Sequence, residues 1–141
     1  MELVGAPVNE LRSILTSSFE HWAAEPSHTK SCALSGGATA MIFLGALTQA
    51  RIDWQPITLF WADEREVAPH DPESNYGLAE RMLLRPLGAR GPRAFRMPTD
   101  QMPLGQAALW YDELLASKLG HGPLDLAILG DRKSTRLNSS H

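Results

Sequence analysis

The sequence predicts an α/β fold built on an open, mostly parallel sheet with helices on both faces, and three observations lead to this prediction. Segments with helical spacing of apolar residues alternate with short runs that are typical of strands. Two of these runs, 57–62 and 124–129, are apolar almost throughout, which favours strands buried on both faces. Glycines or charged residues follow the runs at 31–35 and 57–62, where right-handed crossovers bring strand ends to one edge. The arrangement is Rossmann-like.

Four helices are expected, over 8–24, 39–50, 74–85 and 105–119. The first has apolar residues at spacings of three and four, namely Val8, Leu11, Ile14, Leu15, Phe19 and Trp22. Ser74 is a suitable N-cap for the third helix, and Pro86 is expected just beyond its end. A short strand is a further expectation over 94–97.

Composition excludes several classes of protein. The chain has 141 residues, enough for one domain or part of a larger one, and its net charge of −3 disfavours a nucleic-acid partner. The sequence lacks an apolar run long enough to span a membrane, a signal-peptide pattern and a zinc-like cluster of ligands. The single cysteine, Cys32, has no internal partner and is expected in the core, so a cytoplasmic location is predicted.

A glycine-rich loop, Ser35-Gly36-Gly37-Ala38-Thr39, joins the first expected strand to the next helix. Glycines let a ligand approach the backbone closely, and the start of a helix presents unpaired N–H groups, so the loop is suited to binding a phosphate. Thr39 is a candidate either to cap the helix or to donate its hydroxyl to that phosphate. A plain tight turn explains the two glycines equally well on this motif alone.

A charged segment, Asp63-Glu64-Arg65-Glu66-Val67, follows the strand at 57–62 and should reach the same edge of the sheet. The guanidinium of Arg65 matches the oxygens of a phosphate or a carboxylate. Asp63 is a candidate to orient Arg65 or to hold a substrate hydroxyl. The competing interpretation is a solvated loop with weak local ion pairs.

These motifs occur in order along the chain, followed by Ser-Asn-Tyr at 74–76 and Asp-Leu-x-x-Leu-Gly at 125–130. The ordered set resembles the 6-phosphogluconolactonase family over about residues 8–130. Glucosamine-6-phosphate deaminases are relatives that share the fold and the glycine loop. The combination of Asp-Glu-Arg with Ser-Asn-Tyr is more similar to the lactonase branch.

The resemblance implies hydrolysis of 6-phospho-D-glucono-1,5-lactone to 6-phosphogluconate in the pentose phosphate pathway, with no cofactor. It implies a sugar phosphate as the small-molecule partner. The residues that it implies for substrate binding are Ser35, Gly36, Gly37, Thr39, Asp63 and Arg65. A deaminase-like enzyme and a non-catalytic sugar-phosphate-binding fragment are the alternatives.

The chain departs from the family pattern at three places. Ala38 and Ala40 stand where the family often has Ser and Pro. In the family, the strand matching 124–129 leads into an Asp-Gly-His loop whose histidine is taken as the general base. No such loop follows Gly130, and none of the histidines occupies that motif, namely His21, His28, His70, His121 and His141. We therefore expect no catalytic residue in this chain and little or no activity.

Residues 131–141, DRKSTRLNSSH, differ abruptly in composition from the preceding residues and carry three cations and one acid. They resemble one translated reading frame of a sequencing-library adapter. We therefore expect residues 1–130 to be the N-terminal part of an α/β domain that is incomplete because it is truncated, and 131–141 to be a disordered tail of artefactual origin. A natural basic tail, a phosphorylated segment and a glycosylated segment are the alternatives.

Overall fold

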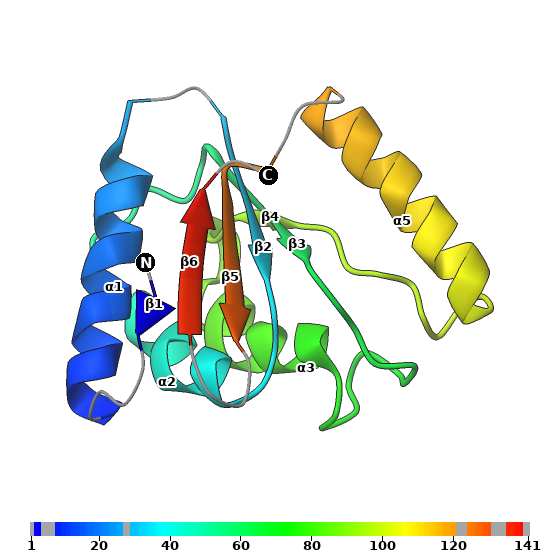
Figure 1. Ribbon diagram of the computed structural model, residues 1–141, viewed down its shortest axis with the longest axis horizontal. Coiled ribbons are helices and arrows are strands. Elements are labelled where there is room, and N and C mark those ends of the chain that lie inside the picture. Colours follow the sequence, from blue (N-terminus) through cyan, green and yellow to red (C-terminus); the bar gives the residue numbers. More distant parts are fainter. Residues whose placement is uncertain (1, 4–7, 27–28, 121–123, 131–134, 140–141) are drawn as a thin grey trace.

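A computed structural model of the chain describes residues 2–3, 8–26, 29–120, 124–130 and 135–139 (Figure 1). The helices are α1 (Val8–Ala24), α2 (Ala38–Leu47), α3 (Asn75–Ala79), α4 (Arg85–Leu87) and α5 (Leu104–Leu119), with a π-helical turn η1 (Glu80–Leu84) and a 3-10 turn η2 (Gly88–Arg90). The strands are β1 (Glu2–Leu3), β2 (Lys30–Leu34), β3 (Ile57–Trp61), β4 (Arg93–Ala94), β5 (Leu126–Gly130) and β6 (Thr135–Ser139).

One sheet contains all the described strands, in the order β1-β6-β5-β2-β3-β4. Strands β5, β2, β3 and β4 are parallel, whereas β6 runs antiparallel to both of its neighbours. The arrowheads of β2, β3 and β5 point to the same edge, the lower one in Figure 1. The predicted open, mostly parallel sheet is therefore confirmed.

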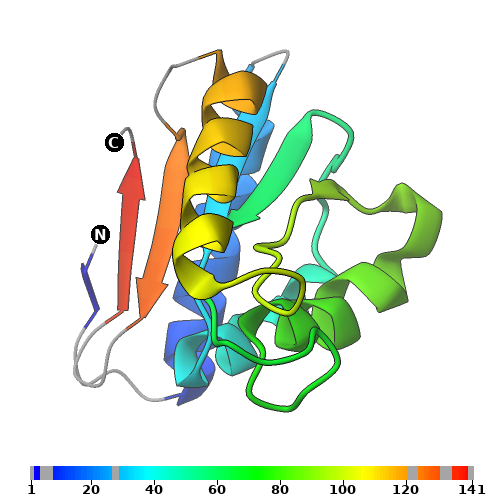
Figure 2. The ribbon, with the colours of Figure 1, turned by 90° about the vertical axis from the view of Figure 1, so that its right-hand side faces the viewer.

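Helices cover both faces of this sheet, as predicted (Figure 2). Helices α1 and α2 lie on one face, and Leu15, Phe19 and Leu44 from these helices are each 1% exposed. They pack with side chains of alternate strand residues, Cys32 and Leu59 among them. Because alternate residues of a strand point to the same face, this pattern gives the main hydrophobic core.

Helix α5 lies on the opposite face and buries only two residues, Ala107 and Tyr111. The hydroxyl of Tyr111 accepts a hydrogen bond from the Trp61 N–H at 2.8 Å and donates one to the Phe95 carbonyl at 2.6 Å. These two bonds attach α5 to the carboxyl end of β3 and to the residue that follows β4.

The helix expected over 74–85 begins at Asn75 and continues beyond Pro86 as α3, η1 and α4. The expected end at Pro86 is therefore wrong. Proline lacks an N–H and clashes with the carbonyl four residues earlier. The preceding turn is π-helical, with the Arg85 N–H donating to the Glu80 carbonyl, and this wider turn accommodates the proline inside the helix. The strand expected over 94–97 is also shorter, as β4.

Residues 135–139 form strand β6, which pairs with both β5 and β1. The expectation that the tail is disordered is therefore wrong for these five residues, because the exposed edge of β5 offers backbone groups for pairing. The artefactual origin of the tail stays a prediction, and residues 131–134 and 140–141 lie outside the described residues. Among the described helices, none has the length and apolar character needed to cross a bilayer.

Candidate functional site

Three segments meet at the carboxyl edge of the sheet: the glycine loop after β2, the charged segment after β3 and the start of α3. A Cβ atom placed on Gly36 would lie 1.9 Å from Oδ1 of Asn75, so the buried Asn75 side chain occupies the space that a side chain at Gly36 would need. The Asn75 Nδ2 group donates to the Asp63 carbonyl at 3.1 Å. Asn75 therefore joins the glycine loop to the charged segment.

The glycine loop ends at the start of α2. Gly37 is the N-cap residue and has a φ of +87°, a conformation that favours glycine. Glycine has no side chain to accept from the first N–H groups of the helix, so they stay available for an anion. Thr39 is the second residue of α2 rather than its cap, so the capping role considered for Thr39 is wrong. The Thr39 side chain lies outside the described part of the chain.

The start of α3 is different, because a carboxylate of the chain itself occupies it. The two oxygens of Glu64 accept from the Asn75 N–H at 2.7 Å, the Tyr76 N–H at 2.9 Å and the Ser74 hydroxyl at 3.0 Å. Ser74 Oγ in turn accepts from the Gly77 N–H at 3.0 Å, which confirms the predicted N-cap. The start of α3 lies at the expected edge of the sheet, but the Glu64 carboxylate already occupies the positive end of the helix dipole, where a ligand anion would bind.

Arg65 does not interact with Asp63 as one of our interpretations had it. The Arg65 Nη1 atom pairs with Glu73 Oε2 at 3.1 Å, and the two side chains are 52% and 72% exposed. The backbone beside Arg65 is held from another element, since the buried Thr99 hydroxyl donates to the Arg65 carbonyl at 2.9 Å. The guanidinium therefore stays open to solvent on an anchored backbone.

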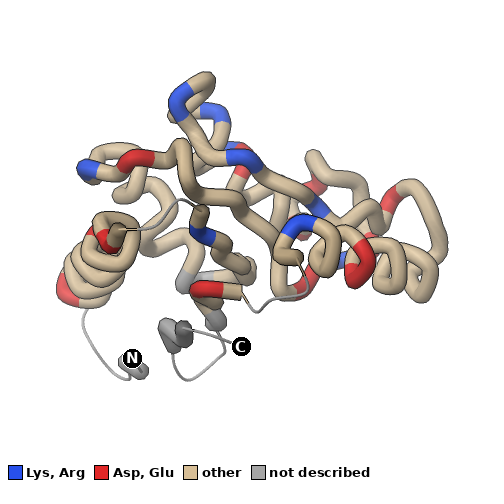
Figure 3. The backbone as a smooth tube through the Cα atoms, turned by 90° about the horizontal axis from the view of Figure 1, so that it is seen from above, with Lys and Arg blue, Asp and Glu red and all other residues tan. Residues whose placement is uncertain are grey.

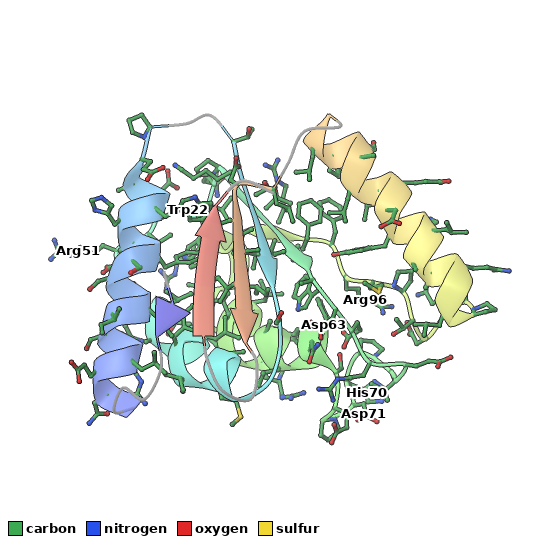
Figure 4. All side chains as sticks on the ribbon, in the orientation of Figure 1. Trp22, Arg51, Asp63, His70, Asp71 and Arg96 are labelled. Carbon is green, nitrogen blue, oxygen red and sulfur yellow. The ribbon has the colours of Figure 1, made fainter. Side chains whose placement is uncertain are left out.

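Figure 4 shows Asp63 close to the start of α3, with His70 and Asp71 farther out in the same loop. Asp63 and His70 are both exposed. His21 is exposed on α1, and the other three histidines lie outside the described residues. Within the described ranges, the acidic, histidine and cysteine side chains form no group of three or more that could hold a metal ion.

Two buried groups near the sheet have perturbed acidities. Burial raises the pKa of the Cys32 thiol, and the Asp125 carboxylate raises it further, so Cys32 is a neutral core residue as predicted. Burial also raises the pKa of Tyr111, with a smaller lowering effect from its bond to the Trp61 backbone. Tyr111 is therefore a neutral hydroxyl that bridges backbone groups.

Three residues that organise this edge are not predicted to do so by the sequence: Glu64, Asn75 as a bridge, and Thr99. Carboxylates favour the positive ends of helices, but Glu64 lies ten residues before Ser74 and has no local signal for this contact. Asn75 and Thr99 have no local signal either, since their bonds join segments that are distant in sequence.

Comparisons with known proteins identify the family of the chain. A family model described as glucosamine-6-phosphate isomerases/6-phosphogluconolactonase matches residues 8–131. The chain belongs to this family. Within it, the chain is similar to a 6-phosphogluconolactonase of Aggregatibacter actinomycetemcomitans, with 31% identity over 108 residues that make up 74% of this chain and 46% of the relative. It is also similar to one of Synechocystis, with 35% identity over 70% of this chain and 43% of the relative.

Solved structures show the same fold. The 6-phosphogluconolactonase of Thermotoga maritima superposes with a TM-score of 0.72 at 23% identity, over 89% of this chain and 56% of the other. The enzyme of Trypanosoma brucei gives a TM-score of 0.73 at 22% identity, over 91% of this chain and 59% of the other. The chain thus spans about half the length of the curated relatives that it matches.

Proposed function

We propose that the carboxyl edge binds the phosphate of a phosphorylated sugar lactone, and that the parent enzyme hydrolyses 6-phospho-D-glucono-1,5-lactone to 6-phosphogluconate. The observation that supports this most is the contact of Asn75 with Gly36, together with its bond to the Asp63 carbonyl. Through Asn75, the α2 start, which has no side-chain cap, belongs to the same edge as the segment that carries Arg65. Amide groups and a guanidinium at one edge suit a phosphate.

The residues differ in the roles that we assign to them. Ser35, Gly36 and Gly37 form the phosphate loop, with Thr39 in the first turn of α2. Arg65 supplies positive charge, and Asp63, which does not pair with Arg65, is left to accept from a sugar hydroxyl. The hydrolysis needs no cofactor, because the substrate is already an activated ester.

The hydrolysis itself needs a proton acceptor. Water attacks the lactone carbonyl while a base takes one of its protons, the ring C–O bond then breaks, and the protonated base returns that proton to the ring oxygen, which becomes a hydroxyl. In the described residues, the glycine loop, residues 63–67 and the start of α3 contain no histidine. We therefore expect this chain to bind the product, 6-phosphogluconate, without hydrolysing the lactone faster than it hydrolyses in solution.

Calorimetric titration of the whole chain with 6-phosphogluconate tests the proposal. We expect saturable binding that Arg65→Gln weakens about tenfold or more, because a charged hydrogen bond contributes at least about 1.4 kcal/mol. The matched control is Arg51→Gln, an exposed arginine on the far side of the molecule (Figure 4), which should bind like the wild type. Absence of binding, or an equal loss in both variants, would overturn the proposal.

A second activity has specific support, because the matching family model also describes glucosamine-6-phosphate isomerases. A glucosamine-6-phosphate deaminase superposes with a TM-score of 0.68 at 19% identity, which shows the shared fold. The test is ammonia release from glucosamine 6-phosphate. Release that Arg65→Gln abolishes and Arg51→Gln preserves would favour this activity over lactone hydrolysis.

A further inference from the structure

A cavity of about 340 Å³ lies at the opposite edge of the sheet, where the strands begin. Its walls come from the starts of three strands, through Ser31, Thr58 and Arg93, and from the last turn of α5, through Lys118 and Leu119. The proposed phosphate site lies beyond the other end of the same strands. A cavity of this volume is in the range that small-molecule ligands occupy.

The charged groups of this cavity favour an anion. Lys30, Arg93 and Lys118 are cationic, and Asp125 is the acidic residue among the lining side chains, in a chain whose net charge is −3. Figure 3 looks onto this edge, with basic residues in blue and acidic residues in red. The lining therefore has a local positive excess that the rest of the chain does not share.

The charged groups of the cavity differ in whether they already have partners within the protein. Asp125 is committed to the sheet, since its Oδ2 atom accepts from the Ser31 N–H at 2.8 Å and from the Ser31 hydroxyl at 3.2 Å. The Lys30 ammonium is committed too, because it donates to the carbonyls of Ala23 and Glu25. Within the described ranges, neither Arg93 nor Lys118 pairs with a carboxylate.

The apolar part of the lining consists of two aromatic residues, Phe60 and Phe95, together with Leu119. Phe60 is 1% exposed and stacks on Phe95, with ring centroids 5.9 Å apart and planes inclined by 21°. The Lys118 ammonium lies 4.7 Å from the centroid of the Phe95 ring. A cationic group beside stacked rings suits a ligand that combines an oxyanion with an aromatic ring.

We propose that this cavity, which we call the amino-edge cavity, is a second small-molecule site that binds an aromatic oxyanion such as an aryl phosphate. Arg93 and Lys118 hold the oxyanion, and Phe95 and Leu119 contact the ring, while the buried Phe60 supports Phe95 from behind. The site is separate from the proposed sugar-phosphate site and shares no residue with it.

The experiment is a calorimetric titration of the whole chain with phenyl phosphate. We expect saturable binding that the double variant Arg93→Gln/Lys118→Gln weakens about tenfold or more. Both side chains are exposed, so the fold should persist, and an unchanged thermal midpoint checks this. The matched control is Arg51→Gln/Arg90→Gln, which removes two exposed charges outside the cavity and should bind like the wild type.

Ligand controls separate the two halves of the proposal. Inorganic phosphate lacks the ring and benzyl alcohol lacks the charge, so each should bind about tenfold more weakly or worse than phenyl phosphate. Saturating 6-phosphogluconate should leave phenyl phosphate binding unchanged. The proposal is overturned by an absence of saturable binding, by equal affinity for inorganic phosphate, by an equal loss in the control double variant, or by competition from 6-phosphogluconate.

Discussion

The two faces of the sheet are held by different kinds of interaction. On the face covered by α1 and α2, large apolar side chains such as Phe19, Phe43 and Leu44 are each 1% exposed. On the other face, α5 leaves Leu109 and Trp110 at 67% and 45% exposure. The first face is stabilised mainly by burial, whereas α5 depends strongly on the two hydrogen bonds of Tyr111. The same substitution should therefore change the free energy of unfolding by very different amounts on the two faces.

The largest contrast is expected from one substitution made on both faces. Leu44→Ala removes a buried side chain and leaves a cavity, so it should lower the free energy of unfolding by about 2–5 kcal/mol. Leu109→Ala removes an exposed side chain and should change it by about 0.5 kcal/mol or less. Urea denaturation followed by circular dichroism measures both values. Comparable losses in the two variants would contradict the difference between the faces.

Tyr111→Phe tests how α5 is held. The phenylalanine ring fills the same space, but the Trp61 N–H and the Phe95 carbonyl lose their partner. Leaving such buried groups unpaired should cost about 1–3 kcal/mol. Hydrogen exchange at the Trp61 amide should become faster than in the wild type, while amides of α2 should change less. Unchanged exchange at Trp61 would mean that the hydroxyl does not hold the helix.

Glu64→Gln tests the polar contacts that fix the start of α3. A neutral amide has one acceptor oxygen in place of two and no charge to complement the helix dipole. The loss of these charged contacts at the start of α3 should cost about 1 kcal/mol in the free energy of unfolding. Because Glu64 orients Asn75, the affinity for 6-phosphogluconate should fall as well. Glu66→Gln, at an exposed residue of the same segment, is the control and should alter neither value.

Much of the fold could be predicted because its signals are local. The periodicity over 8–24 predicted α1 with the observed bounds, and the apolar run at 57–62 predicted β3 to within one residue. The π-helical turn before Pro86 could not be predicted from propensity, since proline normally ends a helix. Strand β6 was not predicted because its residues lack the apolar pattern of a strand. They pair with the open edge of β5 through backbone groups, which do not depend on that pattern.

The candidate site was harder to predict than the fold. Sequence order placed Gly36 and Asp63 at one edge, but the side chain that joins them, Asn75, belongs to a helix start that by propensity is used for capping. Asp63 was one candidate to orient Arg65, the other role being to hold a substrate hydroxyl, and the observed partner of Arg65 is Glu73. Ion pairs between long exposed side chains depend on small differences in geometry, and their weak energies leave little trace in the sequence.

The smallest predicted effect on the free energy of unfolding concerns the connection between β4 and α5. The Arg96 guanidinium donates to Asp100 at 2.7 Å, and this hydrogen bond, together with the charge of Arg96, lowers the pKa of Asp100 below its usual value of 3.8. Because the ionised carboxylate is favoured in the folded chain, the pair stabilises the fold above the pKa of the unfolded chain. This contribution is lost as the pH falls through the lower folded pKa.

Asp100→Asn should therefore lower the free energy of unfolding by about 0.5 kcal/mol at neutral pH, the scale of a partly exposed ion pair. The difference from the wild type should vanish in strong acid, where the carboxyl group is protonated in both states. The measurement is a set of urea midpoints across this pH range for the wild type, each single variant and the Arg96→Gln/Asp100→Asn double variant. If the difference persisted in the Arg96→Gln background, the dependence on pH would have a source other than this pair.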